Sequence, residues 1–360
     1  MKIGFALPRG RHAGGIERYA FELSEDLRAR GHRCVLLADG AVDPAYAAGF
    51  DEHRTLDAGS GLSVIYAQKA ELAERLPASV PLLVAAHDHD DTCVRSHRYL
   101  PRDHSPCHRA PGLGCVTNGC FVVRTREGRL PFGLRDPFSL RSRVRELSRR
   151  ATFVACSRYV QDRLLEAGAE RVTVVHPVPR DAQLEPTRRP RSMSLLVVAQ
   201  LVRGKGVDVA IRALAHLPGA RLVVAGDGAQ RGELEALAAE AAPDLVTFLG
   251  QVGKDDVGAL YDACSVALVP SRWPEPFGMV GLEAMGRGRP VAGADHGGIP
   301  EWLDDDGGAR FRPNDPVDLA AVVRALDARD DAEARAVLSR ARFSRAATVE
   351  RLEALLEAAC

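Results

Sequence analysis

The chain has 360 residues, more than one hydrophobic core usually serves, so we expect two domains. Hydrophobic residues make up 46% and charged residues 27%, which is ordinary for a globular protein. The net charge is zero, so the composition lacks the excess of positive charge that is typical of proteins that bind nucleic acid or an anionic membrane. No run approaches the roughly 20 apolar residues of a membrane span, and the first residues lack the features of a signal peptide. We therefore expect a cytoplasmic protein with mostly reduced cysteines.

Short apolar strands alternate with helical patterns in the first half of the chain. Helices are predicted over residues 14–31, 138–150 and 158–168, with Gly31 as a helix stop and Ser157 as a helix cap. Strands are predicted at residues 2–8, 34–39, 62–67, 81–87, 152–156 and 172–176. Residues 177–192 hold four prolines and no periodicity, which indicates a linker.

The alternation restarts after the linker. Strands are predicted at residues 195–200, 221–226, 245–250, 265–271 and 289–294, and helices at 207–217, 232–242, 254–262 and 279–288. Continuous apolar strands between helices predict parallel sheets covered on both faces. We therefore predict two doubly wound α/β domains, 1–178 and 179–343, and a terminal helix, 344–360, that could cross back to the first domain. Ligands of such sheets bind beyond the carboxyl ends of the strands, so facing domains would share a site in the cleft between them.

Two features follow strands of the first domain. Gly14 and Gly15 open a helix after the first strand, which suits a phosphate, although an ordinary glycine turn has the same pattern. The pattern is not G-x-G-x-x-G, which counts against an NAD-dependent oxidoreductase. His87 ends the strand 81–87 and could transfer a proton or orient a hydroxyl. The alternative is a solvated histidine, and position favours His87 over His89.

Comparable positions in the second domain carry cations and glycines. Arg203 and Lys205 flank a glycine just before a helix, where they could hold a diphosphate, or be solvated loop charges. Gly226 and Val252 follow two further strands, where backbone groups could contact a ligand.

The segment "PEPFGMVGLEAMGRGRP" contains two glutamates with seven residues between them. Glu275 lies in the loop after a strand, and Glu283 lies inside the next helix, on the side of its first amides. Together they could contact two parts of one ligand, one carboxylate binding ribose and the other the reacting group. Alternatively, they are a loop glutamate and one that complements the helix dipole. The first-turn amides belong to Phe277, Gly278, Met279 and Val280.

This segment resembles the glutamate, seven residues, glutamate motif of the retaining GT-B glycosyltransferases, most closely glycosyltransferase family four. The resemblance extends over nearly the whole chain through "AGGIER", "AAH", "CSRYVQDRL", "LVRGKGVD", "VVAGDG", "FLG", "ALVPS" and "GRPVAG", in this order. It implies the GT-B fold, two Rossmann-like domains facing across a cleft.

The resemblance also implies a reaction: transfer of a sugar from a nucleotide diphosphate sugar to an acceptor hydroxyl, with retention and without a divalent metal. Preorganised cations and amides would stabilise the charge that develops on the leaving diphosphate. The two-carboxylate geometry of hydrolases has no visible counterpart here, which favours same-face attack. By this likeness, Lys205, Arg203 and the amides of Gly15, Met279 and Val280 would contact the diphosphate. Glu283 would bind the ribose, and Glu275 would contact the donor sugar. His87 would contact the donor sugar or the acceptor.

One residue departs from the family pattern. Gln200 stands where the family usually has an arginine, and Arg203 would have to supply that charge. The departure leaves a second reading open, a non-catalytic nucleotide-sugar-binding protein of the same fold.

A cysteine-rich insert, residues 88–120, follows His87 and is expected to shape the acceptor pocket. We predict a structural zinc site there. Two disulfides, or reduced thiols lining the acceptor side, are the alternatives. The helix at 138–150 carries an arginine run that fits either a membrane-surface helix or a solvated face. The proposed zinc ligands are Cys93, Cys107, Cys115 and Cys120.

Overall fold

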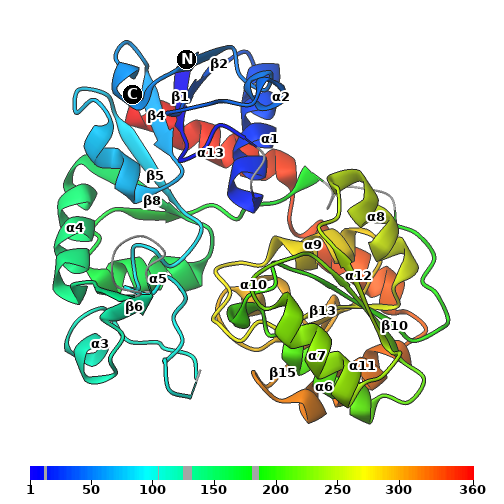
Figure 1. Ribbon diagram of the computed structural model, residues 1–360. Coiled ribbons are helices and arrows are strands. Elements are labelled where there is room, and N and C mark those ends of the chain that lie inside the picture. The colour runs from blue at the N-terminus through cyan, green and yellow to red at the C-terminus, as the bar shows by residue number, and fades with distance from the viewer. Residues whose placement is uncertain (12–13, 104, 125–131, 181–185) are drawn as a thin grey trace. The chain divides into compact units, whose positions relative to one another are not determined.

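The computed structural model describes residues 1–11, 14–103, 105–124, 132–180 and 186–360, and it divides into two compact units (Figure 1). The first unit comprises Met1–Pro101, His108–Pro177 and Arg345–Cys360. The second comprises Arg102–Cys107 and Val178–Ser344. The terminal helix α13, Arg345–Ala359, thus belongs to the first unit. Within the described ranges, no helix is both long enough and apolar enough to cross a membrane.

The first unit is built on a parallel sheet of seven strands in the order β3-β2-β1-β4-β5-β8-β9. Strand β1 pairs with both β2 and β4, so the strand order reverses at β1. The central strands are buried on both faces, which is why their sequences read as continuous apolar runs. The strands are β1 (Lys2–Ala6), β2 (Arg33–Leu37), β3 (Glu52–Arg54), β4 (Val64–Ala67), β5 (Leu82–Ala86), β8 (Ala151–Ala155) and β9 (Val172–Val174).

Two of the main helices of this unit begin at a side chain that caps them. The Ser157 hydroxyl accepts a hydrogen bond from the Val160 amide at 3.1 Å, which confirms the predicted cap of α5. Asp136 caps α4 with a proline at the first helical position. The main helices are α1 (Gly15–Ala29), α4 (Pro137–Arg150), α5 (Arg158–Ala167) and α13; smaller elements are α2 (Pro44–Ala47), α3 (Leu113–Thr117), β6 (Val122–Arg124) and β7 (Phe132–Leu134).

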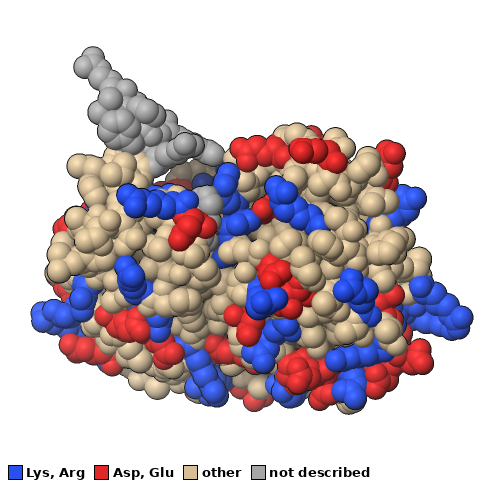
Figure 2. Space-filling view, turned by 90° about the horizontal axis from the view of Figure 1, so that it is seen from below, with Lys and Arg blue, Asp and Glu red and all other residues tan. Residues whose placement is uncertain are grey.

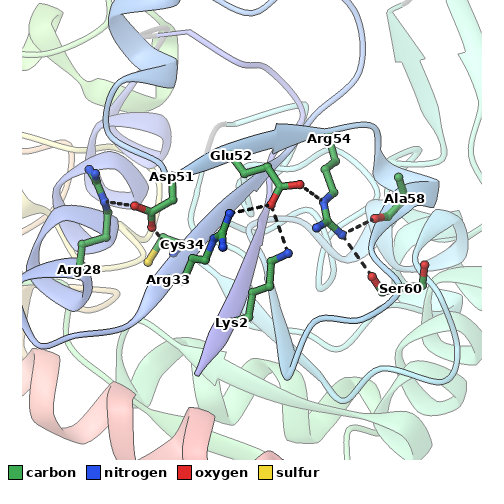
Figure 3. A network of polar contacts seen from close by, with 9 residues as sticks. All are labelled: Lys2, Arg28, Arg33, Cys34, Asp51, Glu52, Arg54, Ala58 and Ser60. Carbon is green, nitrogen blue, oxygen red and sulfur yellow. Dashed lines mark hydrogen bonds and ion pairs between the residues drawn. The ribbon is translucent and has the colours of Figure 1, made fainter.

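The short edge strand β3 is additional to the predicted elements, and charged side chains attach it to the sheet (Figure 3). Glu52 lies 2.6 Å from the Arg54 guanidinium, 3.2 Å from the Lys2 ammonium and 3.6 Å from Arg33. Asp51, just before the strand, accepts a hydrogen bond from the Cys34 amide at 2.7 Å. The strand consists of three polar residues, Glu52, His53 and Arg54, and has no apolar alternation, so periodicity could not reveal it.

The second unit contains a parallel sheet of six strands in the order β12-β11-β10-β13-β14-β15. Its strand order reverses at β10, which pairs with β11 and β13. Both units are therefore doubly wound α/β sheets, as predicted. The strands are β10 (Ser194–Val198), β11 (Arg221–Ala225), β12 (Val246–Gly250), β13 (Val266–Val269), β14 (Val291–Ala294) and β15 (Gly308–Phe311).

Helices of the second unit follow the predicted ones, with two shortenings, of 207–217 and 279–288, and several additions. The helix predicted over 207–217 is an α-helix only to Ala213, and a 3₁₀ turn, Leu214–His216, continues it. Strand β15 and helices α10, α11 and α12 are additional to the prediction. The helices are α6 (Val207–Ala213), α7 (Arg231–Ala241), α8 (Lys254–Ala263), α9 (Met279–Gly286), α10 (Ile299–Trp302), α11 (Pro316–Asp327) and α12 (Ala332–Ala341).

Positive and negative side chains are interspersed on the face shown in Figure 2.

Candidate functional site

Two loops meet where the strand order of the second unit reverses. The loop after β10 enters the 3₁₀ turn Arg203–Lys205, and the loop after β13 leads to α9. The Gly204 carbonyl accepts hydrogen bonds from the amides of Arg272, at 2.8 Å, and Trp273, at 3.1 Å. Gly206 has φ +63°, and a Cβ added there would lie 2.0 Å from the Pro270 carbonyl oxygen. Glycine is therefore required for the two loops to approach this closely.

The loop contact places the Glu275 carboxylate among three donors. Its Oε1 lies 2.7 Å from the Lys205 Nζ. Its Oε2 accepts hydrogen bonds from the Ser271 hydroxyl at 2.7 Å and from the Trp273 indole at 2.8 Å. The Lys205 ammonium also lies 5.0 Å from the Trp273 ring centroid, within the range of a cation–π contact. Lys205, which was predicted to hold the diphosphate, and Glu275, which was predicted to contact the donor sugar, therefore share one site.

The charge state of Glu275 follows from these contacts. Its side chain is buried, with 7% of the residue exposed, and burial by itself would raise its pKa. The charge of Lys205 and the hydrogen bonds from Lys205, Ser271 and Trp273 oppose burial and hold the pKa of Glu275 below its ordinary value. The site is therefore a preformed ion pair at neutral pH, and an anionic ligand would compete for its ammonium group.

The start of α9 is held rigidly beside this loop. Gly278 precedes the helix with φ +94°, and the Trp302 indole donates to the Phe277 carbonyl. A Cβ on Gly281 would lie 2.0 Å from the Trp302 ring, so only glycine allows this packing. The first N–H groups of a helix have no partner inside it, which leaves the amides of Met279 and Val280 for a ligand, whereas the Gly281 amide donates to the Gly278 carbonyl at 3.1 Å. Met279 and Val280, the first two residues of α9, are half-buried.

Glu283 lies one turn further along α9 and is also buried. Its Oε2 accepts a hydrogen bond from the Tyr261 hydroxyl of α8 at 3.0 Å. Tyr261 was not singled out from the sequence. Its position in a helix before β13 gave no sign that its hydroxyl would reach α9, 22 residues later.

The other predicted donor-binding residues also follow strands of this sheet. Arg203 is 46% exposed and lies 3.6 Å from Glu233, an ion pair that solvent weakens. Gly226, after β11, has φ +134°, and a Cβ there would lie 1.9 Å from the Ala199 carbonyl oxygen. Val252 is half-buried after β12, and Gln200 is exposed after β10.

His87 follows β5 of the first unit, and its side chain is fixed rather than solvated. Its Nε2 lies 3.2 Å from the Gln68 side-chain oxygen, and its ring packs edge-on against Tyr19 at 5.5 Å. Burial lowers the pKa of His87 to about 4, so the imidazole is neutral at pH 7. When Nε2 donates to the Gln68 oxygen, Nδ1 carries the free electron pair.

Gln68 is a residue that sequence reasoning missed. It follows β4 directly and is only 1% exposed. The sequence signal was present, since a polar residue after an apolar strand is the pattern that singled out His87. Lys69 and Asp88, the next residues along, form an ion pair, and Lys69 also pairs with Asp90. Side chains thus join the ends of β4 and β5.

Gly14 and Gly15 lie after β1, where the first sheet reverses its strand order, and α1 begins at Gly15. Gly14 has φ −172°, an extended conformation open to any residue, so its backbone does not demand glycine. Residues 12 and 13, in the same loop, lie outside the described residues.

The structure does not gather the four cysteines of the insert. Cys120 belongs to a buried apolar cluster with Val94 and Leu140, and Cys115 packs against it. Across the described part of the chain, one group of three potential metal ligands converges, and none of its members is a cysteine. His104, within the insert, lies outside the described residues. The zinc site at Cys93, Cys107, Cys115 and Cys120 thus remains a prediction, which elemental analysis of purified protein would test.

Solved structures with this fold include known glycosyltransferases. The chain aligns with Anabaena Alr3699/HepE, described in complex with UDP and glucose, at a TM-score of 0.74, with 21% identity and 99% of each chain covered. It aligns with WaaG, a glycosyltransferase involved in lipopolysaccharide biosynthesis, at a TM-score of 0.69, with 19% identity over 98% of this chain and 99% of that one. At these identities the likeness establishes the GT-B fold.

Curated relatives match about half of this chain and about half of their own length. Glycogen synthase of Mycobacterium tuberculosis is 34% identical over 207 residues, which is 54% of this chain and 50% of that protein. D-inositol 3-phosphate glycosyltransferase of Mycobacterium avium is 35% identical over 198 residues, 51% of this chain and 46% of that protein.

Two family models match consecutive parts of the chain. "Glycosyltransferase Family 4" matches residues 13–178, and "Glycosyl transferases group 1" matches residues 182–345. Together they cover nearly the whole sequence, and the chain belongs to the family 4, group 1 glycosyltransferases.

Proposed function

We propose that this protein is a retaining glycosyltransferase that moves a sugar from a nucleotide diphosphate sugar to an acceptor hydroxyl. The observation that carries the proposal is the Lys205–Glu275 ion pair, set at the reversal point of the second sheet. Doubly wound sheets bind their ligands at such points. The descriptions of HepE with UDP and with UDP-glucose support a uridine diphosphate sugar as the donor.

The second unit supplies the donor contacts in this proposal. Lys205 and Arg203 bind the diphosphate together with the amides of Met279 and Val280. Glu283 binds the ribose. As the glycosidic bond breaks, negative charge grows on the leaving diphosphate, and these groups stabilise it without reorganising. Lys205 already lies in a fixed position, because Glu275 and the Trp273 ring hold its ammonium group.

Glu275 binds hydroxyls of the donor sugar near the anomeric carbon. Three donors already hydrogen-bond its two oxygens and stabilise the anion. Such a carboxylate is a poor nucleophile, because attack would cost it these interactions. We therefore favour same-face attack, in which the acceptor oxygen bonds the anomeric carbon as the bond to the diphosphate breaks. The leaving phosphate oxygen takes the acceptor proton. Lys205, Arg203 and the first amides of α9 supply the charge stabilisation that a divalent metal would otherwise give.

His87 contributes a neutral imidazole to the donor sugar or the acceptor. With Nε2 donating to Gln68, Nδ1 is an acceptor for a hydroxyl hydrogen. A protonated imidazole could not accept this hydrogen bond, and burial of His87 disfavours the protonated form.

The test is nucleoside diphosphate release on incubation with UDP-, GDP- and dTDP-sugars and a panel of hydroxyl acceptors. Binding can be followed separately by tryptophan fluorescence, because both tryptophans of the chain, Trp273 and Trp302, lie in or beside the candidate site. Lys205→Met should abolish release. With the unaltered protein, the product should keep the donor's anomeric configuration. The rate of release should be the same in the presence of EDTA. If no nucleotide sugar binds, the proposal fails.

The alternative is a nucleotide-sugar-binding protein without transferase activity. Gln200 favours it, because an exposed amide cannot replace the phosphate-neutralising charge that the family usually has there. Saturable binding without release for any acceptor would support this alternative.

A further inference from the structure

We propose that the first unit carries a divalent transition-metal site formed by His32, Glu353 and Glu357. His32 lies between α1 and β2, and the two glutamates lie one turn apart on α13. One ligand atom from each residue lies within 4.8 Å of the other two. This is the sole group of three or more potential metal ligands in the described ranges. The proposal is independent of the transferase reaction.

The three side chains suit a metal that accepts nitrogen and oxygen ligands. The His32 Nε2 lies 2.5 Å from the Glu353 Oε1, so this nitrogen faces that carboxylate, and Nδ1 lies 3.2 Å from the N-terminal ammonium of Met1. A metal ion would take the place of any proton on Nε2. The side chains of His32 and Glu353 are 9% and 16% exposed, so packing limits their movement. Glu357 is exposed, and water could fill the remaining coordination positions. One imidazole and two carboxylates favour Zn²⁺, Co²⁺ or Ni²⁺ over Ca²⁺ or Mg²⁺, which prefer oxygen ligands alone.

Two cations, Arg30 and the N-terminal ammonium of Met1, lie beside the group, but its two carboxylates repel each other. Glu353 and Glu357 are four residues apart on a helix, a spacing at which like charges repel. Arg30 pairs with Glu353 at 2.7 Å and lies 3.9 Å from Glu350. No ion pair to Glu357 is found in the part of the chain that the structure covers. A divalent cation between the two carboxylates would turn this repulsion into attraction.

Arg30 has a second effect, on orientation. Its Nε binds the Glu353 Oε2, which leaves Oε1 directed at His32. Carboxylate ligands of metals are commonly held by such an outer hydrogen bond.

The site would join segments from opposite ends of the chain. His32 and Glu353 are 321 residues apart, and α13 packs on the first unit through its buried Leu352 and Leu356. A metal bound only when α13 is docked stabilises the docked state by mass action. The metal would thus have a structural role, stabilising the docked position of α13, and would take no part in sugar transfer.

Calorimetric titration and thermal unfolding of the full-length, chelator-treated protein with ZnCl₂ test the proposal. We expect one equivalent of Zn²⁺ to bind through this group and to raise the Tm. Glu357→Gln should weaken that binding at least tenfold and remove the Tm rise. Glu357 is exposed, so the variant should fold. Glu350→Gln, an exposed glutamate on the same helix outside the group, is the matched control and should bind as the unaltered protein does.

Co²⁺ separates this site from the cysteine insert. Binding here should give weak d–d absorption without the intense thiolate charge-transfer bands of a cysteine site. Equal binding by the unaltered protein and Glu357→Gln, or thiolate bands as the only signal, would overturn the proposal.

Discussion

Replacing Lys205 with methionine isolates the interaction on which the candidate donor site depends. The change keeps most of the side-chain volume and removes the charge that Glu275 faces at 2.7 Å. Removing one partner of a fully buried ion pair costs about 3–5 kcal/mol. The Lys205 side chain is 24% exposed and the Glu275 side chain 9%, so water screens part of the pair. We discount the cost accordingly and expect a loss of about 2 kcal/mol in the free energy of unfolding at pH 7.

The loss of stability should depend on pH, because it depends on the ionisation of Glu275. The folded-state pKa of Glu275 lies below its ordinary value, so its ionised form stabilises the protein above the unfolded-state pKa. That stabilisation is lost as the pH falls through the folded-state pKa. In Lys205→Met, the ammonium group no longer opposes the effect of burial, so the pKa of Glu275 rises. Glu275 is then protonated at a higher pH than in the unaltered protein, and protonation removes the buried, unpaired charge. The deficit of Lys205→Met should therefore be largest near pH 7 and shrink toward pH 4.

Urea unfolding followed by tryptophan fluorescence measures the effect in the right unit, because both tryptophans lie in the second unit. A double-mutant cycle with Glu275→Gln should show non-additive losses, since the residues are in contact. A deficit of equal size at pH 7 and pH 4, or strictly additive losses, would refute the assignment of the ion pair.

Three further predictions concern other parts of the molecule. Arg203→Ala should raise the donor KM or lower kcat tenfold or more, on the order of 1.4 kcal/mol, in steady-state kinetics. Gln68→Leu should release the His87 ring to populate both neutral tautomers, visible in long-range ¹H–¹⁵N spectra of histidine-labelled protein, and should lower kcat. Gly206→Ala should destabilise the second unit by clearly more than Gly219→Ala. Both glycines have positive φ, but only at Gly206 would the new methyl meet backbone, so Gly219→Ala should cost roughly 1 kcal/mol.

Each comparison has an outcome that contradicts it. Arg212→Ala, an exposed arginine of α6, controls for general loss of charge, and equal kinetics in both arginine variants would disprove the role of Arg203. An unchanged single tautomer in Gln68→Leu would show that the amide does not orient His87. Equal destabilisation at the two glycines would mean that φ alone, rather than the contact with Pro270, demands Gly206.

Local sequence patterns predicted most elements because periodicity and capping are properties of neighbouring residues. The sequence predicted both the helix cap at Ser157 and the alternation of apolar strands with helices. Two strands without an apolar run escaped: β3 is held by the charges around Glu52, and β15 has the sequence Gly-Ala-Arg-Phe. The site residues were predicted by their positions after strands and by family resemblance.

Contacts between distant residues are what the tertiary structure decided. Lys205 and Glu275 are 70 residues apart, and only the adjacency of β10 and β13 brings them into one ion pair. The same holds for Gln68 and His87, which are in contact because they follow the adjacent strands β4 and β5. Strand order and side-chain direction arise from packing over the whole sheet, which no stretch of sequence specifies alone. The residue types and their places along the chain were therefore determined by the sequence, and their partners by the fold.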